Sequence, residues 1–125
     1  MGSSSVAAVP RTPDAGRRLR SLLWSTFECW GCDGELLDDA CLVLSELVGN
    51  AVRHAEGESV QVRLRRSEGV LRIAVADGSI APPAPRGARL DDESGRGMVI
   101  VEALSLRWGW EPSAAGKVVW ADVPC

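Results

Sequence analysis

The stretch from Glu35 to Ala55 constrains the fold of this chain more than any other segment. Its apolar residues recur at every third or fourth position, which is the pattern of a long helix with one apolar face. They are Leu36, Leu37, Ala40, Val43, Leu44, Leu47, Val48 and Ala51. Because a single helix cannot bury such a stripe on its own, this segment must pack on another layer of secondary structure.

The residues that follow predict that this layer is a sheet. Apolar and polar residues alternate over 60–65 and 71–75, and Ser67-Glu68-Gly69 lies between them, which indicates an antiparallel hairpin. Further strands are expected over 106–110 and 118–123. Two more helices are expected, one from the Thr12-Pro13-Asp14 start to about Trp30 and one over 97–104. Residues 1–9 are expected to form a flexible terminus or an edge strand.

This order predicts an α/β chain folded as a two-layer sandwich, with helices on one face of a mixed, mostly antiparallel sheet. With 125 residues, 46% hydrophobic and 25% charged, the chain fits one domain, expected over 10–125. A net charge of −3 gives no electrostatic case for direct nucleic-acid binding. No apolar run approaches the roughly 20 residues of a membrane helix, and no export signal is visible. We therefore expect a cytoplasmic protein with reduced thiols and no membrane partner.

Cys29 and Cys32 form a C-x-x-C pattern, which is typical of redox or metal chemistry. They lie at the expected end of a helix, where the dipole disfavours a thiolate. Further zinc ligands at a usual spacing are missing. A structural role is therefore the favoured interpretation, and a thiol protein that uses this pair is the alternative.

Three segments carry residues suited to chemistry. Glu46 and Asn50 lie one helical turn apart, at the rim of the apolar stripe, where polar side chains could face a ligand. A solvated polar edge beside a hydrogen-bonded His54 is the alternative. Asp77-Gly78 ends a predicted strand, where a carboxylate can accept a hydrogen bond from a ligand or start a turn.

The third segment is Gly95-Arg96-Gly97-Met98, at the start of the last predicted helix. Glycines let a backbone approach a phosphate closely, and a helix N-terminus offers it free N–H groups. The preceding stretch, 78–93, contains three prolines that exclude a helix interior. A loop of this length in a small domain is functional or disordered.

Together these segments resemble the GHKL-type ATPases, which share the Bergerat-type ATP-binding fold. The segment 46–55, ELVGNAVRHA, resembles the N box, VADG at 75–78 the start of the G1 box, and GRGMVIV at 95–101 the G2 box. Trp108-Gly109 and the closing 116–121, GKVVWA, resemble the small bacterial members, among them the anti-sigma-factor serine/threonine kinases. The resemblance covers 10–123, nearly the whole chain.

The resemblance implies ATP and Mg²⁺ as cofactors. It implies that Glu46 is the general base, that Asn50 binds the metal, and that Asp77, with Gly78, accepts the adenine amino group. The segment Gly95-Arg96-Gly97-Met98 would contact the phosphates, and 78–93 would form a lid over them. It also implies a partner protein, such as a sigma factor or an anti-sigma antagonist, and a homodimer as a further expectation.

Two features depart from the family pattern or narrow it. Gly78 is followed by Ser79-Ile80-Ala81, so the later glycines of the G1 box are missing, and 91–93 places three acids before the phosphate loop. These departures favour, as the alternative function, a module that sequesters a partner without catalysis. The single histidine lies inside the N box, so this chain is not expected to be a complete histidine kinase; phosphate would go to another protein.

Overall fold

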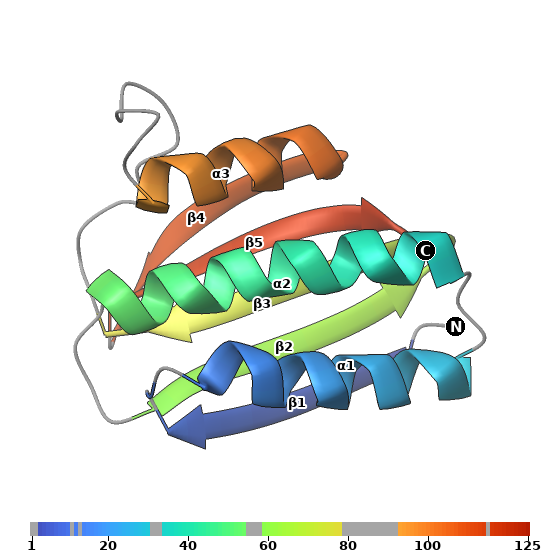
Figure 1. Ribbon diagram of the computed structural model, residues 1–125, viewed down its shortest axis with the longest axis horizontal. Helices are drawn as coiled ribbons and strands as arrows, with labels where there is room; N and C mark the ends of the chain where they lie inside the picture. The colour runs from blue at the N-terminus through green and yellow to red at the C-terminus, as the bar shows by residue number, and fades with distance from the viewer. Residues whose placement is uncertain are drawn as a thin grey trace.

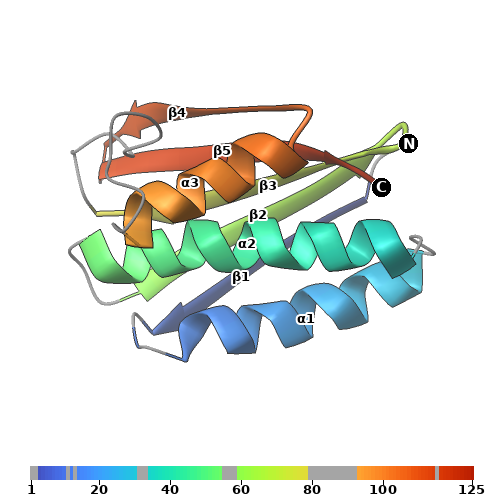
Figure 2. The same cartoon turned by 45° about the horizontal axis from the view of Figure 1, so that its top comes forward.

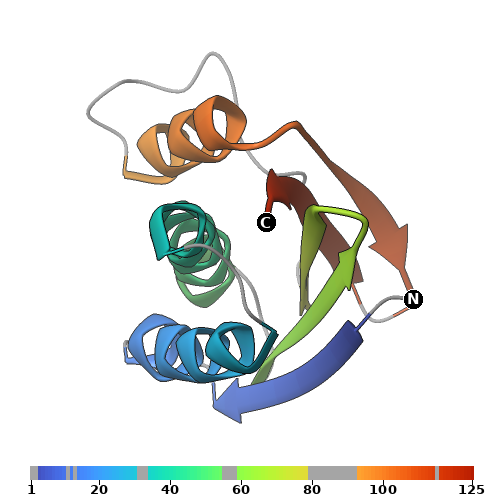
Figure 3. The same cartoon turned by 90° about the vertical axis from the view of Figure 1, so that its right-hand side faces the viewer.

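The structure is a computed structural model that describes residues 3–10, 12, 14–30, 34–54, 59–78, 93–114 and 116–125. Five strands form one sheet in the order β1-β2-β3-β5-β4: β1 Ser3–Pro10, β2 Ser59–Ser67, β3 Val70–Asp77, β4 Arg107–Ser113 and β5 Gly116–Pro124. Three helices, α1 Ala15–Trp30, α2 Gly34–His54 and α3 Glu93–Leu104, lie on one face of it (Figures 1 and 3). The expected two-layer sandwich is confirmed. Each described pair of neighbouring strands is antiparallel, so the sheet is not mixed.

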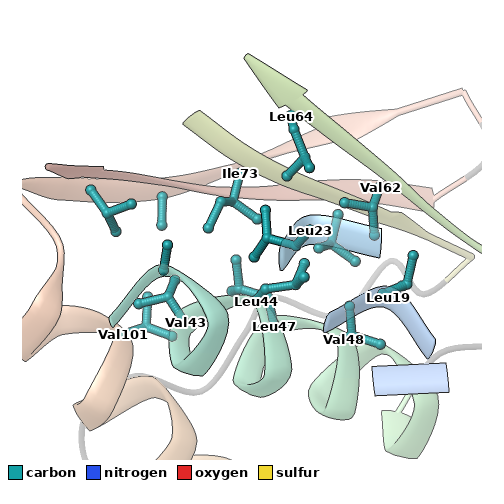
Figure 4. Close-up of a cluster of buried hydrophobic side chains, with 14 of the residues drawn as sticks. Leu19, Leu23, Val43, Leu44, Leu47, Val48, Val62, Leu64, Ile73 and Val101 are labelled. Carbon is teal, nitrogen blue, oxygen red and sulfur yellow. The ribbon is translucent and has the colours of Figure 1, made fainter. Parts of the chain in front are cut away.

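The helices α1 and α2 run antiparallel on the sheet, and α3 lies beside α2 (Figure 2). Their apolar faces meet the inward residues of the central strands in one core (Figure 4). The core includes Leu19 and Leu23 of α1, Val43, Leu44, Leu47 and Val48 of α2, Val62 and Leu64 of β2, and Ile73 of β3. The apolar stripe of α2 therefore lies between the two layers, as its spacing predicted.

Local signals placed most element ends to within a few residues. The turn between β2 and β3 has positive φ at both central residues, 50° at Glu68 and 79° at Gly69, which is a type I′ hairpin turn. At the start of α1 the Asp14 carbonyl accepts the Arg18 amide, so Asp14 rather than Thr12 holds the N-cap position. The Thr12 hydroxyl instead donates to the Asp14 carboxylate. Residues 3–10 form an edge strand paired with β2, which is one of the two expected alternatives.

No helix in the described part of the chain is long and apolar enough to cross a membrane.

Candidate functional site

Four element ends gather at one end of the molecule. The carboxyl ends of α2 and β3 lie there together with the amino ends of α3 and β5, at the left of Figures 1 and 2. The elements that carry Glu46, Asn50, Asp77 and the glycines of α3 are therefore brought to a common place, although 79–92 between them lies outside the described residues. The expected lid falls in that segment.

Glu46 and Asn50 occupy successive turns near the carboxyl end of α2. Asn50 is only 9% exposed, and Glu46 is half-buried, whereas their neighbours Leu47, Val48 and Ala51 lie in the core. An amide in this position is not part of a freely solvated helix edge. Its oxygen is the kind of ligand atom that Mg²⁺ prefers. The side chain of His54, one turn further, lies outside the described residues.

Asp77 ends β3 with its side chain facing the helical layer. The carboxylate is 4% exposed, and its Oδ1 lies 3.3 Å from the Nζ of Lys117, which is also 4% exposed. The register of the sheet explains the contact, because Asp77 and Lys117 are direct cross-strand partners on β3 and β5. A charged pair removed from water in this way is stable only while both members are present.

Lys117 is the residue of this site that sequence reasoning missed. The resemblance at 116–121 includes this residue but implies no role for it. The signal was its rarity, because it is the only lysine among fourteen basic residues. Its partner depended on strand register, which spacing along the chain does not reveal.

Gly116 fixes how closely β5 approaches the end of β3. A Cβ atom at this position would lie 2.2 Å from the carbonyl oxygen of Asp77 and 2.7 Å from backbone atoms of Gly78. Its φ of 155° is also one that side-chain-bearing residues rarely adopt. The glycine therefore holds the Asp77–Gly78 backbone against β5 and positions the carboxylate.

The start of α3 corrects the expected phosphate loop. The helix begins at Glu93, four residues before the predicted start at Gly97, so Gly95 and Arg96 lie in its first turn. An acid at the first position suits the positive end of a helix. Because only about the first four N–H groups of a helix are free, those of Gly97 and Met98 are engaged within it. The Met98 side chain is 1% exposed and lies in the core.

The cysteines give a second correction. Cys125 is disulfide-bonded, so the expectation that all thiols are reduced is wrong for this residue. Cys41 is free, and burial is the main cause that raises the pKa of its thiol, which makes it a weak nucleophile. The side chains of Cys29 and Cys32 lie outside the described residues.

The fold is a two-layer domain with polar residues near the element ends that gather at one end of the molecule, and the comparison with known families identifies its class. The histidine kinase-like ATPase domain family matches residues 9–122, so the chain belongs to that family. The resemblance drawn from the three boxes is confirmed at this level.

Two solved structures share the fold. One is the crystal structure of the RsbU and RsbW domains of Rv1364c from Mycobacterium tuberculosis, with a TM-score of 0.75 and 20% identity over 98% of this chain. The other is the histidine kinase domain of a blue-light activated histidine kinase from Erythrobacter litoralis, with a TM-score of 0.56 and 21% identity over 93% of this chain. The chain spans 32% of the first and 61% of the second. No curated protein matches it.

Proposed function

We propose that this chain is a cytoplasmic ATP-binding regulatory protein that transfers the γ-phosphate of ATP to a serine or threonine of a partner protein. The observation that carries the proposal is that two polar residues, Asn50 and Asp77, are each only 9% exposed, on two elements, α2 and β3, whose carboxyl ends lie where α3 begins. Family membership supports ATP as the ligand. The fold shared with the RsbW-containing structure supports a regulator of a sigma factor, or of its antagonist, as the biological class.

The residues present suit a magnesium nucleotide. The Asn50 amide oxygen would hold the ion, which takes few protein ligands and leaves other positions to phosphates and water. Asp77 would accept the adenine amino group; a carboxylate has capacity for several hydrogen bonds, so the Lys117 contact does not exhaust it. The free amides in the first turn of α3, from Glu93 to Arg96, would face the phosphates.

Glu46 would act on the protein substrate. A bound magnesium nucleotide would supply the γ-phosphoryl group. Glu46 would accept the proton of the attacking hydroxyl as that oxygen bonds to the γ-phosphorus, while the bond from this phosphorus to the bridging oxygen breaks and ADP leaves. Its half-buried position one turn before Asn50 keeps it beside the metal ligand.

The test measures binding and transfer separately. Titration calorimetry with Mg²⁺-ATP should detect binding by the wild type, and Asn50→Ala should weaken it at least about tenfold. Glu46→Gln should bind as the wild type does but transfer no labelled phosphate to purified candidate partners encoded beside its gene. Absence of wild-type binding at millimolar ATP would overturn the proposal.

A second function is favoured by the Asp77–Lys117 ion pair together with the missing glycines of the G1 box. A carboxylate that is already paired with a buried lysine has less hydrogen-bond acceptor capacity left for the adenine amino group. In this alternative the chain holds its partner without catalysis, and Glu46→Ala and the wild type would bind that partner equally with no phosphate transferred.

A further inference from the structure

The face of the sheet that points away from the helices is left bare by every described element (Figure 3). Strand register arranges its side chains in three rows that cross the strands. The first row is Arg65, Arg72, Asp122 and Arg107. The second is Val6, Arg63, Ala74, Trp120 and Gly109, and the third is Ala8, Gln61, Ala76, Val118 and Glu111.

The first row places like charges side by side. Arg65 of β2 and Arg72 of β3 are direct cross-strand partners, an arrangement that destabilises a sheet unless an anion lies between them. Asp122 is the one carboxylate in the row, and it already accepts hydrogen bonds from Arg72 and Arg107. Arg65 takes part in no ion pair among the described residues.

Asp122 holds two of these arginines in place. Its side chain is 2% exposed and receives Arg72 through Nε and Nη2 at 2.7 and 2.9 Å, and the Nε of Arg107 at 2.6 Å. The two arginine side chains are themselves 45% and 70% exposed. Both guanidinium groups are therefore fixed by a buried anchor while their remaining N–H groups face solvent, which is a pre-organised site for carboxylates.

A hollow of about 300 Å³ lies at this row, lined by Arg65, Arg72, Arg107 and Asp122 and by residues of the β2–β3 turn, including Glu68. Beside it lies a smaller hollow of about 120 Å³, whose floor is formed by Ala74, Ala76 and Val118 and whose lining also includes Gln61 and Arg63. At the boundary between the two hollows, the Cζ of Arg72 lies over the Trp120 ring, 4.2 Å from its centroid. Charged contacts at one end and an apolar floor at the other suit a peptide segment with both kinds of side chain.

The charges on this face indicate which kind of partner could bind there. The face carries four arginines: Arg63, Arg65, Arg72 and Arg107. Its carboxylates are Asp122, which is already paired, Glu111 in the third row and Glu68 at the rim. The face therefore keeps an excess of positive charge, which an acidic segment complements better than a second copy of the same face does. The Arg72 guanidinium lies over the Trp120 ring, so this ring is not free to stack on a nucleobase, which disfavours a nucleic acid.

We propose that the outer face of the sheet docks an acidic segment of a partner protein, with carboxylates on Arg65, Arg72 and Arg107 and apolar side chains on the Ala74–Ala76–Val118 floor. The site is distinct from the candidate nucleotide site. The row lies five residues along β3 from Asp77, about 17 Å, and on the opposite face of the sheet. Docking here therefore does not depend on ATP.

The probe is a short fluorescein-labelled peptide that repeats Glu-Leu-Glu-Ala, compared by fluorescence anisotropy with its Gln-Leu-Gln-Ala counterpart. The test variant is Arg63→Glu with Arg65→Glu, two exposed side chains that make no ion pair among the described residues, so that the Asp122 anchor stays intact. The matched control is Arg17→Glu with Arg20→Glu on α1, which makes the same change in net charge at two exposed positions. Circular dichroism verifies that both variants are folded.

We expect the acidic peptide to bind the wild type and the glutamine peptide to bind it at least about tenfold more weakly. The affinity for the acidic peptide should fall at least about tenfold in the β2 variant and change less than about twofold in the α1 control. Amide shifts in an NMR titration should map to β2, β3 and β5, and Mg²⁺-ATP should leave the affinity unchanged. Equal loss in both variants, shifts on α1, absence of binding at low salt, tighter binding of oligouridine, or a dimer that the β2 variant dissociates would each overturn it.

Discussion

The two central strands β3 and β5 carry an acid–base contact at each end, and the two contacts differ in almost every respect. Asp77 and Lys117 face the helices, and both side chains are 4% exposed. Arg72 and Asp122 lie five residues further along the same strands and therefore face the other way, with the arginine 45% exposed. The same pairing register thus gives a buried ion pair at the candidate nucleotide site and an anchored surface arginine at the outer face.

The two contacts differ in burial, and burial decides how each one affects stability. Burying two charges costs desolvation energy that their attraction only partly offsets, so the inner pair is weak evidence for stability but makes each member depend on the other. The outer carboxylate keeps two solvent-facing arginines in position, and water screens their contribution. The inner contact holds the Asp77 carboxylate in place inside the protein, and the outer one presents charged groups to solvent.

Removal of Lys117 should give the largest effect. Lys117→Ala leaves the Asp77 carboxylate buried without its cation, and we expect a loss of about 3–5 kcal/mol in the free energy of unfolding. Urea denaturation of the wild type and the variant measures it. The matched control is Lys117→Met combined with Asp77→Asn, which removes both charges and should recover most of the loss. A single variant within about 1 kcal/mol of the wild type would contradict a buried pair.

The outer contact should show a smaller effect with a clear pH dependence. Hydrogen bonds from Arg72, and then from Arg107, lower the pKa of Asp122. A carboxylate whose pKa is lowered by folding stabilises the protein above its unfolded value of about 3.9, and this stability is lost as the pH falls toward the folded value. Asp122→Asn should therefore cost about 1–2 kcal/mol at neutral pH, after allowance for solvent screening of the exposed arginines.

Thermal or urea unfolding of the wild type and Asp122→Asn across the acid range tests the direction in which their stability difference changes with pH. The difference between them should be full near neutrality and should shrink as the pH falls below about 4. A difference that stays constant with pH would show that the asparagine acts through packing rather than through the loss of charge.

The two ends also differ in how far the sequence could predict them. The apolar stripe of α2 and the alternation in β2 and β3 are local patterns, so helix, hairpin and layer order were predictable. Lys117 opposite Asp77, and Arg65 beside Arg72, are consequences of pairing across strands that are distant in the chain, and spacing does not reveal register. The early start of α3 at Glu93 was missed because the glycines looked like a loop, and the bond at Cys125 because reduced thiols were assumed from the absence of an export signal.

The smallest effect is expected at Gly109, which differs from Gly116 in what a side chain there would meet. A Cβ at Gly116, on the inner side, would meet the backbone of Asp77 and Gly78, which cannot move without shifting a strand. A Cβ at Gly109, on the outer face, would meet the Trp120 ring at 2.9 Å, and a side chain can slide. Gly109→Ala should therefore cost only about 1 kcal/mol of unfolding free energy. It should also move the Trp120 ring off the Arg72 guanidinium, which NMR of the Arg72 Nε–H signal would detect as a loss of the ring-current shift. An unchanged signal with undiminished stability would mean that the Trp120 ring does not lie against Gly109. The ring would then not form the boundary of the docking face.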